Sequence, residues 1–323
     1  MIKYITRRLL QSIVILFGVT LVIFILIHLA PGDPFIQSMN PNITPELREK
    51  MLRDIGYYDP LAVQYFKWLG QALQGNLGYS IKFNKPVIRV IGDYLPNTIL
   101  LGAISLLLSL LIALPAGIFS STKRNSVFDY MVTIFTFIGL SIPAFFFGLL
   151  LIKWLTYDYN LLPTSGMVSA GMHLEGAAFI ADVAKHIILP TIVLSLLQTA
   201  TFMRYTRSSM IEVIGEDYIR TARAKGLGEG KVIYKHAFRN ALISIITIIT
   251  LSIPTVFSGA VLTETIFVWP GIGRVNYDAI LGRDYPLIMG IMLLMAVIIL
   301  LSNFLADILY AFADPRIRYD EEV

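Results

Sequence analysis

"TILLGAISLLLSLLIALPAGIF", residues 98–119, is a mostly apolar stretch without Asp, Glu, Lys or Arg. A run of this length is close to the ~20 residues that cross a ~30 Å hydrocarbon layer as a helix. Inside a bilayer the backbone must satisfy its own hydrogen bonds, and an α-helix does so within one segment. The composition agrees, because 15% of the residues are charged and 56% are hydrophobic, whereas soluble domains carry about 25% charged residues.

Further runs share this lack of charge. They are residues 9–30, 130–152, 187–203, 241–263 and 286–306. Together they predict an all-α integral membrane protein with six transmembrane helices; helices buried in a large soluble core are the alternative. The first run is longer than the apolar part of a secretory signal, about 7–15 residues, so we expect it to be retained as a helix. The chain has 0 cysteines, which excludes disulfides and thiolate metal sites.

Basic residues set the expected orientation. With six spans, both termini and the 204–240 loop lie on one side of the membrane. That loop carries Arg204, Arg207, Arg220, Arg223, Lys225, Lys231, Lys235 and Arg239. Short loops rich in Lys and Arg stay in the cytoplasm, which predicts cytoplasmic termini. This bias also explains the net charge of +4, so the charge does not require nucleic-acid binding.

The chain is expected to divide into three parts. Residues 1–97 would hold the first span and an extracytoplasmic segment, with helices starting near Thr44-Pro45 and over residues 61–73, the second ending at Gly75. Residues 98–313 would form the transmembrane core with the 204–240 loop. Residues 314–323 would be a cytoplasmic tail.

The glycines after Lys225 suggest a phosphate-binding loop at first sight. Such a loop needs G-x-x-x-x-G-K-[ST], and this chain has Lys225 at the first glycine and Val232 at the hydroxyl position. The segment instead predicts a short helix, with acidic residues at its start, basic residues toward its end and Gly226 as its terminator. A helix this short is marginal in water, so it either packs on its own membrane domain or docks into a partner.

Residues 217–226, DYIRTARAKG, and 235–242, KHAFRNAL, resemble the cytoplasmic loop of ABC-importer permeases of the dipeptide/oligopeptide branch, first-permease type. In the wider family this loop carries an E-A-A pattern before a glycine. Counted back from Gly226, those positions are Arg220, Thr221 and Ala222, so only Ala222 and the glycine match. Other stretches agree with the branch: residues 30–34 (APGDP), 269–273 (WPGIG), 283–286 (RDYP) and 314–317 (DPRI).

The resemblance implies a transport subunit rather than an enzyme, located in the cell membrane of a prokaryote. Its partners would be a homologous second permease, two ABC ATPase subunits and an extracytoplasmic solute-binding protein, and ATP and Mg would be used by the ATPases, with no cofactor on this chain. The resemblance also implies that the short helix inserts into an ATPase subunit. The residues assigned to this coupling helix are Glu216, Asp217, Tyr218, Arg220, Thr221, Ala222, Arg223, Ala224, Lys225 and Gly226.

An internal repeat suggests a second set of functional residues. LSIP occurs at residues 140–143 and again at 251–254. Proline removes an intrahelical hydrogen bond and bends helices, and matched interruptions point to the solute path in transporters. We therefore expect Ser141, Pro143, Ser252 and Pro254 at bends beside a translocation path. Glu264, at the outer end of the fifth run, is a candidate gate or docking residue.

Three functions compete at this stage. The first is a permease subunit for di- or oligopeptides, or for another solute such as an oligosaccharide or nickel. The second is a self-sufficient secondary carrier, which would normally place ionisable residues within its spans; the six runs contain none. The third is an intramembrane hydrolase, for which the sequence offers no convincing nucleophile, acid pair or metal-binding set.

Overall fold

The computed structural model describes residues 2–29, 46, 49–50, 53 and 56–313. Contacts divide the chain into two compact units, Met1–Pro96 with Val275–Ile298 and Asn97–Arg274 with Ile299–Val323. The predicted division into residues 1–97, 98–313 and 314–323 stays a prediction. The expected helix after Thr44-Pro45 falls largely outside the described residues.

The first unit is built around an N-terminal helix. Its elements are α1 (Ile2–Leu29), α3 (Leu61–Leu73), a hairpin of β1 (Tyr79–Ser80) and β2 (Lys85–Pro86), the start of α4 (Val87–Thr122), most of α11 (Ile272–Leu281) and the first half of α12 (Tyr285–Ala313). Tyr65 of α3 packs between Phe24 and Met289, and its hydroxyl lies 2.9 Å from Thr20 Oγ1. The predicted bounds of α3 and its end before Gly75, which has φ +81°, are confirmed.

A buried aspartate ties the hairpin to α12 within this unit. Asp284 accepts hydrogen bonds from the Ser80 hydroxyl at 2.5 Å, from Lys82 N at 3.0 Å and from Leu287 N at 3.3 Å. The last of these caps the first turn of α12. The aspartate of the RDYP stretch therefore has a structural role. It is fully buried and joins two segments that are about 200 residues apart in the chain.

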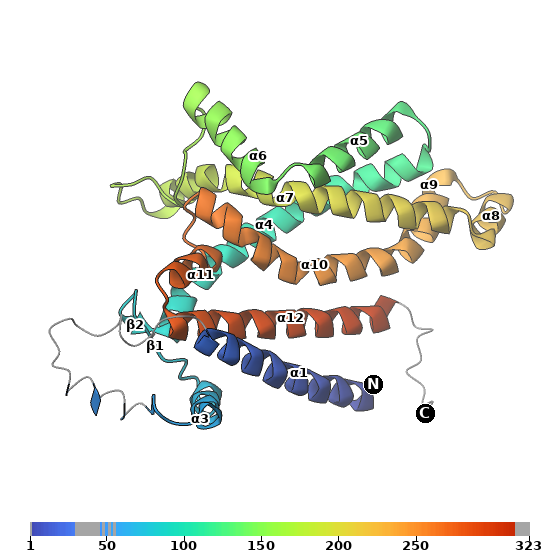
Figure 1. The fold of residues 1–323 in the computed structure, drawn as a ribbon. Helices are drawn as coiled ribbons and strands as arrows, with labels where there is room; N and C mark the ends of the chain where they lie inside the picture. Colours follow the sequence, from blue (N-terminus) through green and yellow to red (C-terminus); the bar gives the residue numbers. More distant parts are fainter. Residues whose placement is uncertain (1, 30–45, 47–48, 51–52, 54–55, 314–323) are drawn as a thin grey trace. The chain divides into compact units, whose positions relative to one another are not determined.

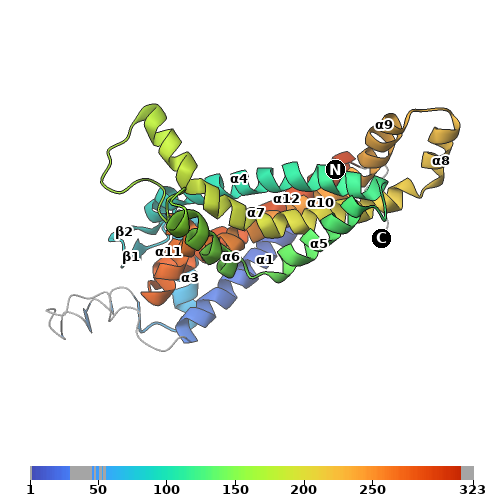
Figure 2. The same ribbon diagram turned by 90° about the horizontal axis from the view of Figure 1, so that it is seen from above.

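The second unit is a bundle of long helices with short connecting ones. It contains most of α4, then α5 (Val127–Ser141), α6 (Ala144–Leu151), the π-helix η1 (Ile152–Asp158), α7 (Gly176–Ile214), α8 (Asp217–Ala224), α9 (Glu229–Lys231), the π-helix η2 (Val232–Phe238) and α10 (Arg239–Ile266). The helix α7 packs against α5, α6 and α10, and Figures 1 and 2 show it running along all three.

The third apolar run forms two helices rather than one kinked helix. The helices α5 and α6–η1 meet at an angle of 99°, which Figure 1 shows as an open V. Ile142, which precedes Pro143, is extended (φ −81°, ψ 122°), and Pro143 starts the next helix as its N-cap. A residue before proline is pushed out of the helical region, so the chain leaves the helix here instead of bending through it.

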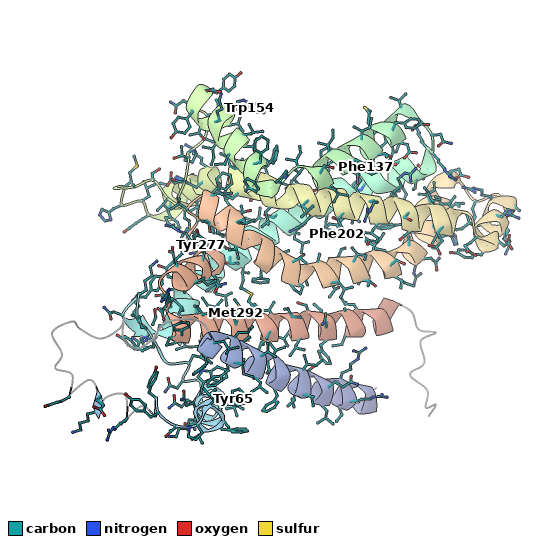
Figure 3. All side chains as sticks on the ribbon, in the orientation of Figure 1. Tyr65, Phe137, Trp154, Phe202, Tyr277 and Met292 are labelled. Carbon is teal, nitrogen blue, oxygen red and sulfur yellow. The ribbon has the colours of Figure 1, made fainter. Side chains whose placement is uncertain are left out.

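The apolar helices agree with a multi-pass membrane protein. In the described part of the chain, 5 helices are long and apolar enough to cross a membrane, or up to 6 if the bent pair counts as one span. Several are longer than the apolar runs that predicted them. Figure 3 contrasts Phe202, which is 2% exposed among the helices of the second unit, with Phe137 and Trp154, which point away from it.

Candidate functional site

The short helix that the sequence predicted over residues 218–225 is present as α8, Asp217–Ala224. Glu216 is its N-cap residue, and Asp217 lies in the first turn, where a negative charge is favoured by the helix dipole. Arg223 lies in the last turn, where a positive charge is favoured for the same reason. Figures 1 and 2 show α8 and α9 together at the end of α7, beyond the packed helices of the second unit.

Gly226 ends α8 through a complete Schellman motif. It adopts φ +75°, and its N–H donates to Arg223 O at 2.9 Å while Leu227 N–H donates to Ala222 O at 3.4 Å. These are the two bonds that define the motif. Leu227 also packs against the apolar cluster that contains Ala222. The predicted glycine terminator is confirmed.

The inner face of α8 is seated in an apolar cluster of the second unit. Ile219 is fully buried and Ala222 is 6% exposed. The other buried members of this cluster, which we call the α8 seat, are Ile118 of α4, Met210 of α7, Val232 and Ala237 of η2, and Ala241 and Ile245 of α10. The seat therefore joins α8 to all three long helices of the bundle. The Ala222 side chain is turned into the chain's own core, so we no longer expect it to contact a partner directly.

The outer face of α8 is exposed and carries mixed charge. Tyr218 is 45% exposed, and its partial burial, together with nearby Glu216, raises the pKa of its hydroxyl. Arg220 pairs with Asp217 at 3.2 Å on this face. The other predicted site residues on it, also exposed, are Glu216, Thr221, Ala224, Lys225 and Gly226.

An ion pair closes the turn after α8. Arg223 donates from Nε to Glu229 Oε1 at 2.7 Å and from Nη2 to Oε2 at 3.3 Å. This contact with Glu229 raises the pKa of the Arg223 guanidinium. The bidentate geometry fixes α9 against α8 across the glycine turn. The result is a short exposed helix that is held at its base by apolar packing and at its end by a backbone motif and an ion pair.

A buried carboxylate lies next to the α8 seat and was not predicted. Asp129, in the first turn of α5, is 3% exposed and accepts from Arg207 Nε at 2.6 Å and Nη2 at 2.9 Å. Ser120 of α4 donates to the same carboxylate at 2.5 Å, and Asn125 N donates at 2.9 Å. The pattern Ser126-x-x-Asp129 is a helix-start signal that would have located the aspartate, but nothing in the sequence named Arg207 as its partner.

Glu264 is buried, so the expectation of a docking residue is wrong. Its carboxylate accepts from Thr98 Oγ1 at 2.6 Å and from Arg274 N at 3.0 Å. A Cβ on Gly271 or Gly273 would overlap the Glu264 side chain. The two glycines of the WPGIG stretch are therefore needed for a close approach of backbone to a buried carboxylate.

The predicted bend residues lie in two different settings. Ser141 and Pro143 are exposed at the break between α5 and α6. Pro254 lies inside α10, which continues through it and is visibly curved in Figure 1, and Ser252 donates to Ile249 O at 2.6 Å within the same helix. Their place beside a translocation path stays a prediction.

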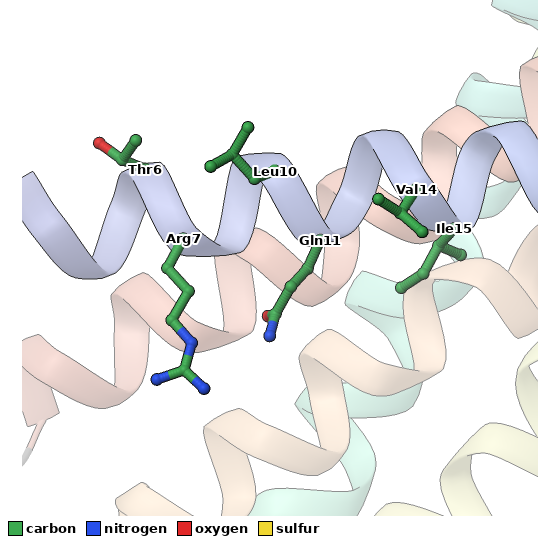
Figure 4. A pocket seen from close by; sticks show the side chains of 6 residues that line it. All are labelled: Thr6, Arg7, Leu10, Gln11, Val14 and Ile15. Carbon is green, nitrogen blue, oxygen red and sulfur yellow. The ribbon is translucent and has the colours of Figure 1, made fainter. Parts of the chain in front are cut away.

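A hollow of about 910 Å³ lies along α1, lined by Thr6, Arg7, Leu10, Gln11, Val14 and Ile15 (Figure 4). All six of these side chains come from one helix, so the hollow does not define a binding site. Among the described residues no group of His, Cys, Asp and Glu could hold a metal ion.

Comparison with known proteins agrees with this architecture. Residues 113–319 match the family model described as binding-protein-dependent transport system inner membrane component, and residues 1–102 match its N-terminal companion. The chain is 45% identical to the oligopeptide transport system permease protein AppB of Bacillus subtilis (strain 168), over 99% of this chain and 100% of the relative. It is 40% identical to the dipeptide transport system permease protein DppB of Escherichia coli (strain K12), over 99% of both chains.

A solved structure shows the same fold. It is an inward-facing conformation of the MetNI methionine ABC transporter, with a TM-score of 0.55 and 16% identity, covering 70% of this chain and 97% of the matched chain. The full-length similarity and the two family models lead to one conclusion. The chain belongs to the binding-protein-dependent transport system inner membrane components, in the branch that contains these oligopeptide and dipeptide permeases.

Proposed function

We propose that this chain is the first permease subunit of an ATP-driven importer of di- or oligopeptides. With a homologous second permease it would form the translocation path for solute that an extracytoplasmic binding protein delivers. The similarity to peptide permeases over nearly the whole chain supports the peptide substrate. ATP and Mg would be used by two separate ATPase subunits, and this chain would bind no cofactor itself.

The α8 helix is proposed as the contact with an ATPase subunit. The observation that carries this assignment is its two-sided environment: Ile219 is fully buried in the α8 seat, while Tyr218, Arg220 and Thr221 on the other side are exposed. A helix of 8 residues is too short to be stable alone in water. Because the seat includes residues of α4, α7 and α10, a displacement of α8 would act on three long helices at once.

The orientation follows from the same assignment. If α8 contacts an ATPase, the 204–240 loop and both termini face the cytoplasm, which agrees with the eight basic residues of that loop. By the alternation of spans along the chain, the segment between the first two spans and the segment between the last two would then face the outer side, where a binding protein would dock.

Isolation of the native assembly in detergent tests the proposal. We expect two ATPase subunits and a second permease to co-purify with this chain. The assembly in proteoliposomes should take up radiolabelled trialanine only when ATP and the binding protein are both present. Uptake of the peptide by this chain alone would refute the proposal. Uptake of an oligosaccharide or nickel in place of peptides would refute the proposed substrate but not the proposed assembly of permeases, ATPases and binding protein.

A further inference from the structure

We propose that Asp129 and Arg207 form a positioning pair that links α8 to the broken span α5–α6 and so sets how tightly ATP use is coupled to solute movement. The inference rests on the proposed function. It concerns residues that lie outside α8 and outside the predicted bends, and it gives the bidentate pair a role in the transport cycle.

The pair lies directly beside the α8 seat. On α7, Arg207 is one helical turn before Met210, which is fully buried in the seat. On α4, Ser120, which donates to Asp129, comes two residues after Ile118 of the seat. The same two helices therefore carry both the apolar seat of α8 and the polar cluster around Asp129.

The helices α4 and α7 are in close contact at this level. A Cβ on Gly117 would lie 2.7 Å from Thr206 Cβ and 3.0 Å from Met203 O, so the glycine permits an approach that no larger residue would allow. Packed elements this close move together rather than slide, because interiors deform little. A displacement of the α8 seat would therefore move Arg207 and Ser120 together.

Asp129 passes that movement to α5. It lies in the first turn of α5, and three separate segments hold its carboxylate: α7 through Arg207, α4 through Ser120 and the preceding turn through Asn125 N. The other end of α5 is the break at Ile142-Pro143, where the chain turns by 99°. Because the helix is interrupted at this break, a shift of α5 can change the angle of the V without unwinding either helix.

The guanidinium geometry matters more than its charge. Arg207 uses two nitrogens on two carboxylate oxygens, and lysine cannot reproduce this fork. The variant Arg207→Lys therefore keeps a cation beside Asp129 but permits the two helices to rotate relative to each other. Ser120→Ala removes one donor and leaves the ion pair in place.

The test measures ATP hydrolysed per trialanine imported by the purified complete assembly in proteoliposomes, alongside its unfolding temperature. Arg207→Lys and Asp129→Asn should raise this ratio about 2- to 30-fold, the range expected from 0.5–2 kcal/mol of lost coupling. Ser120→Ala should raise it by less. The double variant Asp129→Asn/Arg207→Lys should be no worse than the worse single variant, because both changes break one unit.

The control is Lys153→Gln, which removes the exposed pair between Lys153 and Asp158 (2.8 Å) on η1 and should leave the ratio unchanged. A lower unfolding temperature with an unchanged ratio in Arg207→Lys and Ser120→Ala would overturn the inference and leave the pair a purely structural contact. If Arg207→Lys does not fold, an unchanged ratio of ATP hydrolysed per peptide in Ser120→Ala is enough by itself to overturn the inference. Absence of ATP-dependent uptake in the unaltered assembly would instead refute the proposed function.

Discussion

Replacing Gly226 by alanine should loosen α8 without disturbing any neighbour. A Cβ built at Gly226 meets no atom within 4 Å, so the cost comes from the backbone alone. Gly226 has φ +75°, and an L-residue in this region costs roughly 1–2 kcal/mol. That cost corresponds to about a 5- to 30-fold change in the equilibrium between closed and open α8.

Hydrogen–deuterium exchange of the segment 217–227, followed by mass spectrometry of the purified assembly, measures this opening. Gly226→Ala should raise the exchange of these amides by about that factor and leave α7 and α10 unchanged. Gly226→Asn should have a smaller effect, because asparagine tolerates the left-handed region better.

Gly230→Ala is the matched control. Gly230 also has open space around its Cα, but it lies within α9 and is not among the residues with positive φ. Alanine favours a helix over glycine by up to about 1 kcal/mol, so exchange should stay the same or slow down. Equal exchange in Gly226→Ala and the unaltered protein, or faster exchange in both glycine variants, would refute the assignment of the Schellman motif as the support of α8.

Other predictions concern stability, measured as the unfolding free energy or temperature of the purified assembly. Ile219→Ala should destabilise α8 by about 2–5 kcal/mol, because it leaves a cavity in the seat; no loss would mean that α8 is not seated there. Thr98→Val should cost about 1–3 kcal/mol, since Ile272 N loses its acceptor and the Glu264 carboxylate loses one of its donors. An unaltered unfolding temperature would contradict the burial of this cluster. Gly273→Ala should cost about 1–3 kcal/mol through overlap with the backbone of residue 261. Gly70→Ala, inside α3 with nothing within 4 Å, should instead be neutral or stabilise by up to about 1 kcal/mol; equal effects of the two substitutions would refute the close packing.

Short sequence patterns predicted the helices whose ends are determined by neighbouring residues. Residues 61–73 form a helix with the expected limits, and residues 217–224 form one within a residue of the expected 218–225. Apolar spacing, end charges and a following glycine all act within a few residues. The helices α4 and α7 extend beyond their apolar runs, since polar and charged turns continue a helix once the membrane part has formed it. The sequence indicated a bend at Pro143, but its local pattern is the same as at Pro254, where the helix continues.

The polar clusters depend on contacts that the sequence does not encode locally. Asp129 meets Arg207 at a sequence separation of 78 residues, and Glu264 meets Thr98 at a separation of 166. Each residue alone fits an exposed position at the end of an apolar run. Only the packing of the helices places them inside, where a buried carboxylate needs several donors.

The central claim is that the exposed face of α8 contacts an ATPase subunit, and cysteine cross-linking tests this claim most directly. The chain has 0 native cysteines, so Thr221→Cys on the exposed face provides a single thiol, with Lys153→Cys on η1 as the control. We predict that a short reagent with one thiol-reactive and one amine-reactive end joins Thr221→Cys to an ATPase subunit in the complete assembly, with a yield that changes when ATP is added. Lys153→Cys should form no such product. Cross-links to the ATPase from Lys153→Cys and none from Thr221→Cys would contradict the account.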